Sequence, residues 1–128
     1  MRDPRPGLAW SRQRIARRVS YGCWMASPGW AEVRRRWHRE WIRRHGADPS
    51  CAVCGGGWNL AGGDLHHRSY RRLGAECFED LVPLDRDCHD RVHELWDTNP
   101  MWRRIDRAFA NDLIIGLLRN RSTGQQET

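Results

Sequence analysis

The sequence predicts an α+β domain in which a helix on the N-terminal side and a helix on the C-terminal side flank a small strand–loop–strand–helix unit. Within residues 27–46, and again near the C-terminal end, apolar residues recur every three or four positions, which is the period of an amphipathic helix. Two short segments have the length of strands, one at 62–67 that ends on two histidines and an apolar one at 80–84. His89 and His93 are four residues apart, which places both on one face of a third helix.

Composition and charge favour one nucleic-acid-binding domain. The 128 residues are enough for a single domain with a modest core. The 22 basic residues are all arginine, and they exceed the 16 acidic residues to give a net charge of +6. Arginine binds phosphate through a planar fork and stacks on flat rings, so the excess indicates DNA or another nucleic acid as the partner. A GC-rich genome explains the absence of lysine, but it does not explain the positive excess.

Cysteine usage and hydropathy indicate a reducing compartment. No stretch approaches the roughly 18 apolar residues that a membrane span needs, and no apolar run follows the first arginines. We therefore expect a cytoplasmic protein without membrane contact. Its five cysteines are then reduced, and those that cluster are expected to bind metal rather than to form disulfides.

The two ends of the chain are expected to lie outside the folded domain, which we place at 27–120. Residues 1–26 form a basic, mobile arm in which 10–19 can make a short helix. This arm either adds phosphate contacts or is a solvated tail. Residues 121–128 are expected to be disordered.

The first helix of the domain carries its own start and stop signals. Ser27 and Pro28 suit the N-cap and the first helical position, and Gly46 suits the C-terminal cap. The apolar stripe, which we assign to the core, consists of Trp30, Val33, Trp37 and Trp41. The opposite face, which is either a nucleic-acid surface or a solvated one, consists of Arg34, Arg35, Arg36, Arg39, Arg43 and Arg44.

The Cys-x-x-Cys pair after this helix is typical of a zinc site. Cys51 and Cys54 stand in a turn of small residues, where two thiolates can converge on one tetrahedral ion. A redox pair is the alternative, but no βαβ pattern surrounds it. The second half of the site should precede His89, where Cys88 is present but Asp85 replaces a cysteine. A carboxylate can bind zinc, so Asp85 is a chemically acceptable fourth ligand. Cys77 is the substitute, and loss of zinc is the third possibility.

The central unit is predicted from short segments in a fixed order. The strand at 62–67 ends on two adjacent histidines, a polar loop follows at 68–79, and the strand at 80–84 precedes a helix at 86–96. Its expected core consists of Leu65, Leu81, Leu84, Val92, Leu95 and Trp96.

A last helix is predicted after Asn99 and Pro100, ending or breaking near Gly116. We expect it to pack against the tryptophan-bearing helix. Its expected apolar stripe consists of Trp102, Ile105, Phe109, Leu113 and Leu117.

Between residues 37 and 96 the motifs are, in order, Cys-x-x-Cys-Gly, Leu-His-His-Arg-x-Tyr, Leu-Gly-x-Glu, Asp-Leu-Val-Pro-Leu and Cys-His-x-x-x-His. This series resembles the HNH endonuclease family. The resemblance implies a ββα-metal fold, also called a His-Me finger, at about 62–96. It also implies cleavage of DNA phosphodiester bonds around one divalent ion, leaving 5′-phosphate and 3′-hydroxyl ends.

Carried over by position, the resemblance assigns a role to each central residue. His66, His89 and His93 resemble ligands of a catalytic Mg²⁺ or Mn²⁺, with Zn²⁺ or Ni²⁺ as alternatives. His67 resembles the general base, which suits a side chain that titrates near neutral pH. Asp80 takes the place of the family's middle asparagine and is expected either to orient His67 or to accept a hydrogen bond from a residue that binds the ion. The candidate DNA contacts, for which a solvated surface is the alternative, are Arg68, Arg71, Arg72, Arg35 and Arg39.

Two functions follow as expectations. A closed structural site needs four ligands and the motifs offer about seven, which favours a structural zinc beside a separate catalytic ion. The first function is therefore a metal-dependent HNH endonuclease, which family likeness places in phage genome packaging, with terminase proteins as partners, or among mobile-element nucleases. The alternative is a non-catalytic, zinc-bound accessory protein that binds DNA during packaging.

Overall fold

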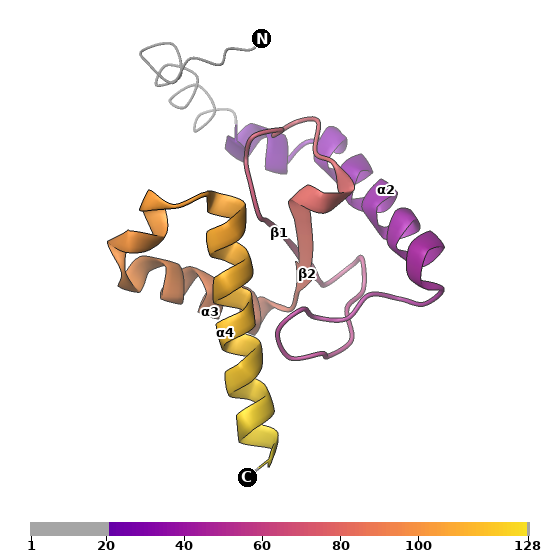
Figure 1. Cartoon of the computed structure of the whole chain (residues 1–128). Coiled ribbons are helices and arrows are strands. Elements are labelled where there is room, and N and C mark those ends of the chain that lie inside the picture. The colour runs from indigo at the N-terminus through magenta and orange to yellow at the C-terminus, as the bar shows by residue number, and fades with distance from the viewer. Residues whose placement is uncertain (1–20, 128) are drawn as a thin grey trace, which may run out of the picture.

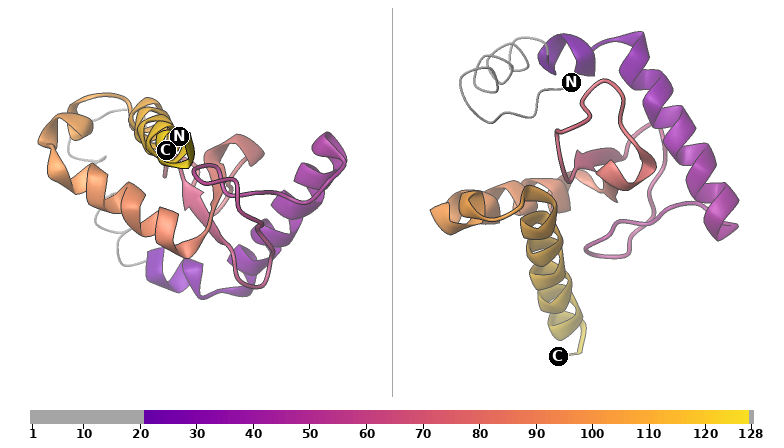
Figure 2. Two further views of the ribbon diagram at one scale, coloured as in Figure 1. Left: turned by 90° about the horizontal axis from the view of Figure 1, so that it is seen from below. Right: turned by 45° about the horizontal axis from the view of Figure 1, so that its top comes forward.

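The computed structural model describes residues 21–127, with side chains described as far as Arg121, and it confirms an α+β arrangement. An antiparallel hairpin lies between helix α2 on one side and helices α3 and α4 on the other (Figure 1). The further views in Figure 2 show the same order of layers. The predicted helix at 10–19 and most of the predicted arm lie outside the described residues.

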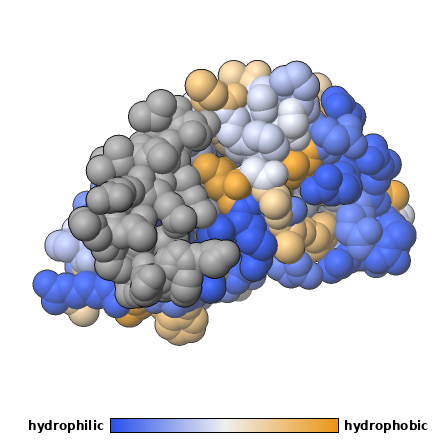
Figure 3. Space-filling view, turned by 90° about the horizontal axis from the view of Figure 1, so that it is seen from above, coloured by the Kyte–Doolittle hydropathy of each residue, from blue (hydrophilic) through white to orange (hydrophobic). Residues whose placement is uncertain are grey.

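Helix α2 spans Pro28–His45, between the predicted caps. The hydroxyl of Ser27 accepts a hydrogen bond from the amide of Trp30, and Gly46 ends the helix at a φ of 73°. A positive φ costs glycine little, so Gly46 can donate its amide to the carbonyl of Ile42. Trp30 and Trp37 are buried, as the stripe predicted. Figure 3 shows hydrophilic residues along the edge of the molecule that α2 occupies.

Strands β1 (Asp64–His67) and β2 (Leu81–Leu84) form the hairpin, and each is shorter than the segment predicted for it. Residue His66 pairs with Val82 and His67 with Leu81. A short 3-10 helix, η1 (Phe78–Asp80), leads into β2. Because neighbouring residues of a strand point to opposite faces, the hairpin divides its side chains between two cores.

Those two cores lie on opposite faces of the hairpin. The first joins α2 to the hairpin and consists of Trp30, Val33, Trp37, Trp58, Leu65 and Leu81. The second joins the cysteine turn to α3 and α4 and consists of Cys51, Val53, Leu84, Cys88, Val92, Ile114, Ile115 and Leu118. The predicted core residues of the central unit are therefore divided between the two clusters. Leu95 and Trp96 lie at the margin of the second.

Helix α3 spans Arg86–Thr98 and continues two residues beyond the predicted end. The carboxylate of Asp85 caps it by accepting a hydrogen bond from the amide of Cys88 at 2.7 Å. After α3 the 3-10 helix η2 (Pro100–Arg104) precedes α4, so the last α-helix begins later than Pro100.

Helix α4 spans Arg107–Glu127 and corrects two expectations. It packs against α3 rather than α2. Gly116 lies within it and does not end it. Its C-terminal turns project beyond the rest of the molecule (Figures 1 and 2).

The apolar stripe predicted for the last helix is also wrong. Ile105, Phe109, Leu113 and Leu117 are between 39% and 56% exposed. The buried face is instead formed by Ala110, Asn111, Ile114, Ile115 and Leu118. Both faces are apolar at helical spacing, so periodicity alone could not choose between them. Among the described helices, none is both long enough and apolar enough to cross a membrane.

Candidate metal centres

The side chains of the adjacent residues His66 and His67 lie on opposite faces of the hairpin. His66 and His67 are both 2% exposed. The ring of His66 contacts those of His89 and His93 on α3. The ring of His67 stacks on Trp30 of α2. Their separation follows from the alternation of side chains along β1.

Three histidines form the first candidate centre. One potential ligand atom from each of His66, His89 and His93 lies within 4.8 Å of the others. The Nε2 atoms of His89 and His93 are 3.1 Å apart, a separation that two nitrogens bound to one ion can adopt. His66 is buried whereas His93 is exposed, so the cluster opens to solvent on the α3 side. Three ligands facing solvent leave positions for water or substrate.

Two further side chains hold these rings in place. Nε2 of His66 is 2.6 Å from Oδ1 of Asn111, and Nδ1 of His89 is 2.9 Å from Oδ2 of Asp64. An oxygen acceptor at one ring nitrogen fixes the hydrogen there and leaves the other nitrogen to bind an ion. Nδ1 of His66 and Nε2 of His89 are therefore the nitrogens left to bind an ion.

Burial lowers the pKa values of two of the three histidines. Desolvation lowers the pKa of His66 to about 3, although the hydrogen bond to Asn111 opposes the shift. Desolvation and the neighbouring His89 also lower the pKa of His93. Neutral imidazole is the form that binds metal, so at pH 7 His66 and His93 are ready to act as ligands.

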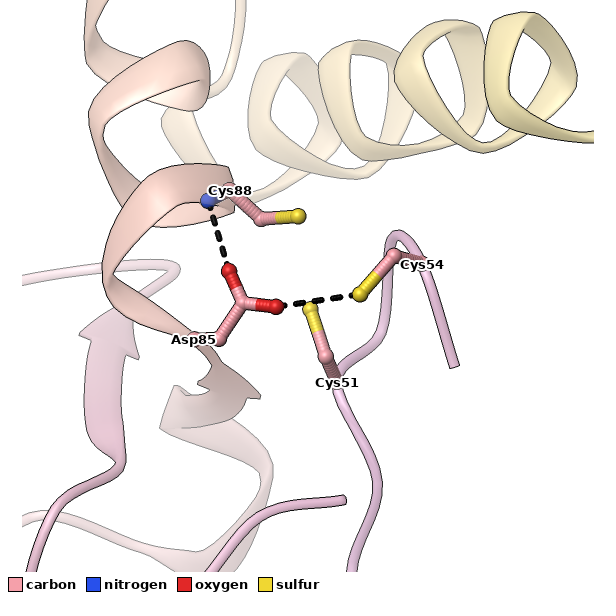
Figure 4. Close-up of side chains that lie close together, drawn as sticks. All are labelled: Cys51, Cys54, Asp85 and Cys88. Atoms are coloured by element: carbon pink, nitrogen blue, oxygen red, sulfur yellow. Dashed lines mark hydrogen bonds between the residues drawn. The ribbon is translucent and has the colours of Figure 1, made fainter. Parts of the chain in front are cut away.

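The second candidate centre contains three cysteines and one aspartate, shown in Figure 4. The potential ligand atoms of Cys51, Cys54, Asp85 and Cys88 lie within 4.8 Å of one another. The residues come from the turn before β1 and from the start of α3. Cys77 lies next to η1 and is not part of the group, so the structure selects Asp85 over Cys77.

Asp85 has two roles because its two carboxylate oxygens face different partners. Oδ1 accepts the α3 cap from the amide of Cys88, and Oδ2 accepts a hydrogen bond from the thiol of Cys54 at 3.0 Å (Figure 4). These bonds lower the pKa of Asp85, with that from Cys54 the largest cause. Burial raises the pKa of Cys88. The four side chains suit Zn²⁺, which binds cysteine sulfur and carboxylate oxygen in a tetrahedral site.

His67 belongs to a separate buried network. Its Nε2 is 2.8 Å from Oε2 of Glu76, and its ring lies between those of Trp30 and Tyr70 with both centroids 5.1 Å away. Glu76 also accepts a hydrogen bond from the indole of Trp24 at 3.1 Å. Burial raises the pKa of Glu76, but the hydrogen bonds from His67, from its own backbone amide and from Trp24 together outweigh burial and leave the pKa lowered.

Asp80 does not orient His67, which corrects our expectation. Its carboxylate accepts hydrogen bonds from the guanidinium of Arg72 at 2.9 and 2.6 Å and from the amide of Cys77 at 2.9 Å. The turn of η1 directs Asp80 towards the loop, whereas Glu76 reaches the ring. The Leu-Gly-x-Glu motif contains Glu76, so a signal was present. Nothing in the sequence, however, indicated that the carboxylate of Glu76 contacts His67.

Most of the predicted DNA-contacting arginines are paired with acidic side chains. Arg68 binds Asp112 through two hydrogen bonds of 2.8 and 2.7 Å, and Arg72 binds Asp80. Arg35 and Arg39 both bind Glu32, whereas Arg71 is exposed. Solvent-exposed ion pairs are weak, so a phosphate can replace such a carboxylate.

Comparison with known proteins adds no assignment. No protein-family model matches the chain, and no curated protein or solved structure matches it either. The chemistry of the two centres therefore carries the functional argument.

Proposed function

We propose that this protein is a metal-dependent endonuclease of the HNH type that hydrolyses phosphodiester bonds in DNA. The observation that carries the proposal is the convergence of His66 with His89 and His93, from β1 and α3, on one solvent-facing centre. A Mg²⁺ or Mn²⁺ ion bound there would polarise a phosphate and stabilise the leaving oxygen. The antiparallel hairpin followed by α3 supports the HNH assignment.

His67 supplies the general base in this proposal. Because Nε2 faces the carboxylate of Glu76, Nδ1 is the nitrogen available to take a proton from water. Glu76 then holds the ring in position and favours the imidazolium that forms, the part first assigned to Asp80. The ring is 2% exposed, so bound DNA must allow water to reach Nδ1.

The cysteine centre has a structural role in the same proposal. Zn²⁺ held by Cys51, Cys54, Asp85 and Cys88 would tie the turn before β1 to the first turn of α3. His89 follows Cys88 directly, so a fixed start of α3 also fixes one member of the three-histidine centre.

DNA is the proposed substrate because the charge excess is positive and arginines lie on α2 and around the hairpin. Phage genome packaging, with terminase proteins as partners, remains our suggested context, beside a mobile-element nuclease.

One observation favours a second candidate. His67 is buried between aromatic rings and bonded to Glu76, as expected of a histidine with a purely structural function. The second candidate is therefore a zinc-bound accessory protein that binds DNA during packaging without cutting it.

A plasmid-nicking assay with Mg²⁺ or Mn²⁺ separates the candidates. We expect the wild type to nick supercoiled DNA and His66→Ala to lose both metal binding and cleavage. His67→Ala should keep metal and DNA binding but cleave about 10²–10⁴-fold more slowly. His45→Ala is the matched control, because His45 stacks on Trp41 at the end of α2, outside both centres.

Metal binding by calorimetry, measured beside cleavage, decides the roles of the two adjacent histidines. If His67→Ala abolishes metal binding while His66→Ala does not, the two assignments are reversed. If the wild type binds DNA and metal but nicks nothing with either ion, the accessory protein becomes the better description.

A further inference from the structure

Arg107, the first residue of α4, is held between two aromatic rings. Its guanidinium carbon lies 4.6 Å from the ring centroid of Tyr70 and 4.6 Å from that of Trp96. A guanidinium between two rings is restrained in position, and its N–H groups can point only outward around the edge of its plane. Arg107 therefore has a defined place and direction before any ligand binds.

No carboxylate neutralises Arg107 among the residues that the structure describes. Arg68, Arg72 and Arg103 each bind an acidic side chain, whereas the interactions found for the guanidinium of Arg107 within the described residues are with aromatic side chains. Its Nε atom is buried and has no hydrogen-bond partner there. A half-buried cation without an acidic partner is costly, and an anion beside its terminal N–H groups would lower that cost.

Arg107 is also joined to the three-histidine centre. Its backbone carbonyl oxygen accepts a hydrogen bond of 2.9 Å from the side-chain Nδ2 of Asn111, and Oδ1 of the same Asn111 side chain lies at hydrogen-bond distance from Nε2 of His66. The positive charge of Arg107 contributes to the lowered pKa values of His66 and His93, after burial and the neighbouring histidines. The guanidinium charge of Arg107 and the three histidines therefore belong to the same region of the molecule.

Electrostatics indicates which ligand joins these groups. A divalent ion on the histidines would feel the positive charge of Arg107, which already acts on His66 and His93, and two cations near each other repel. An anion that contacts both removes this repulsion. A phosphate group suits the position because a guanidinium can donate two parallel hydrogen bonds to two of its oxygens.

We propose that Arg107 forms a phosphate-binding subsite that holds a DNA phosphate beside His66 and His93. The inference rests on the proposed nuclease function and extends it by one residue that contacts the substrate. The competing explanation is structural: Arg107 stabilises the fold by stacking on Tyr70 and Trp96 and never meets a ligand. The two explanations predict different effects of salt.

The test measures binding of a 20-base-pair DNA duplex by fluorescence anisotropy at several salt concentrations. Arg107→Ala should weaken binding and reduce the slope of log affinity against log salt by about one, because one phosphate contact is lost. Arg103→Ala is the matched control. Arg103 also lies over Trp96, at 5.9 Å, but it is paired with Asp97, so its loss should leave the slope unchanged.

A lysine variant and metal binding separate the phosphate contact from packing. Arg107→Lys keeps the charge and loses the planar fork, so the slope should return towards the wild-type value. Mn²⁺ binding in calorimetry should persist in both variants, because neither removes a ligand, and it should be no weaker in Arg107→Ala than in the wild type, because a repelling charge is lost. If Arg107→Ala does not fold, Arg107→Gln replaces it with the same expected slope.

The outcomes distinguish this inference from the proposed function. A reduced slope in a protein that never cuts DNA would support the subsite and reject the nuclease. Normal cleavage and an unchanged slope in Arg107→Ala or Arg107→Gln would overturn the subsite and leave the nuclease standing. A slope that does not recover in Arg107→Lys, together with an equally lowered melting temperature in all variants, would establish the packing explanation.

Discussion

At the scale of single residues, carboxylates hold several of the important side chains of this protein in position. Asp64 and Glu76 each hold a histidine ring, Asp80 holds Arg72, and Asp85 both caps a helix and faces thiols. None of these pairings is local enough to be inferred from spacing, except the cap at Asp85. Each acidic side chain therefore has identifiable partners, and its loss should have a distinct effect.

Asp85→Cys should bind zinc more tightly and yet be less stable without it. The new thiolate would complete a four-cysteine site, which holds zinc more firmly than a site with one carboxylate. The variant also loses the side-chain cap of α3, which costs about 1 kcal/mol in the metal-free protein. Competitive titration with a zinc indicator measures the first effect, and denaturant unfolding after chelation measures the second.

Asp87→Cys is the control for this substitution. Asp87 lies in the first turn of the same helix, outside the cysteine centre. Asp87→Cys should change neither the zinc affinity nor the stability of the metal-free protein appreciably. Weaker zinc binding by Asp85→Cys would contradict the placement of Asp85 as fourth ligand.

At the scale of elements, helix α4 shows most clearly how packing chooses between two apolar faces. Ile114 is fully buried, whereas the preceding Leu113 is 41% exposed. We expect Ile114→Ala to lower the free energy of unfolding by about 2–5 kcal/mol, because it leaves a cavity in the second core. Leu113→Ala should cost less than about 1 kcal/mol. Urea unfolding of both variants measures these losses, and a loss in Leu113→Ala as large as that in Ile114→Ala would contradict the burial of Ile114 in preference to Leu113.

The approach to β1 depends on a close contact between a glycine and a tryptophan. A β-carbon on Gly63 would overlap the indole of Trp58, whose Nε1 donates a hydrogen bond of 2.8 Å to the carbonyl of Asp64. Gly63→Ala should therefore destabilise the protein by about 1–3 kcal/mol through overpacking.

The neighbouring glycine provides the comparison for that variant. A β-carbon on Gly62 would meet only Oδ1 of Asn59 at 3.6 Å, an ordinary contact. Gly62→Ala should change stability by less than about 1 kcal/mol. Thermal unfolding followed by tryptophan fluorescence measures both variants. A Gly63→Ala protein as stable as the wild type would show that Trp58 can move aside.

At the scale of the whole molecule, the cysteine centre connects parts that are distant in sequence. Cys51 and Cys88 belong to the same core as Ile114 and Leu118 of α4, and Arg119 donates a hydrogen bond of 2.9 Å to the carbonyl of Ala52. The turn that carries Cys51 is therefore part of the surface on which α4 packs.

Removal of zinc should accordingly loosen the whole second core. We expect a strong chelator to lower the melting temperature by roughly 10 °C, equivalent to about 2 kcal/mol for a domain of this size. Scanning calorimetry measures the shift. Cys51→Ser should have a lower melting temperature than the wild type, and the chelator should not lower it further. His93→Ala, which lies outside the cysteine centre, should lose as much in melting temperature on chelation as the wild type does. No shift in the wild type would exclude a structural zinc.

Local signals in the sequence predicted several elements and most of the residues that the structure groups together. Helical period and capping residues identified α2, a short apolar segment identified β2, and the segment that ends on two histidines identified β1. Spacing indicated the pairs Cys51/Cys54 and His89/His93, whereas His66 was added by the resemblance and Asp85 was one of the alternatives for the fourth position of the cysteine group. These features depend on residues a few positions apart, or on two segments whose pairing follows from a single hairpin.

Tertiary structure alone decided which partner each side chain meets. Glu76 rather than Asp80 reaches His67, Asn111 fixes His66, and α4 buries Ile114 rather than Leu113. Each of these outcomes depends on where a loop or a distant helix is placed after the chain has collapsed. Periodicity and spacing describe one segment at a time, whereas burial and hydrogen bonding are satisfied by segments that meet only in the folded molecule.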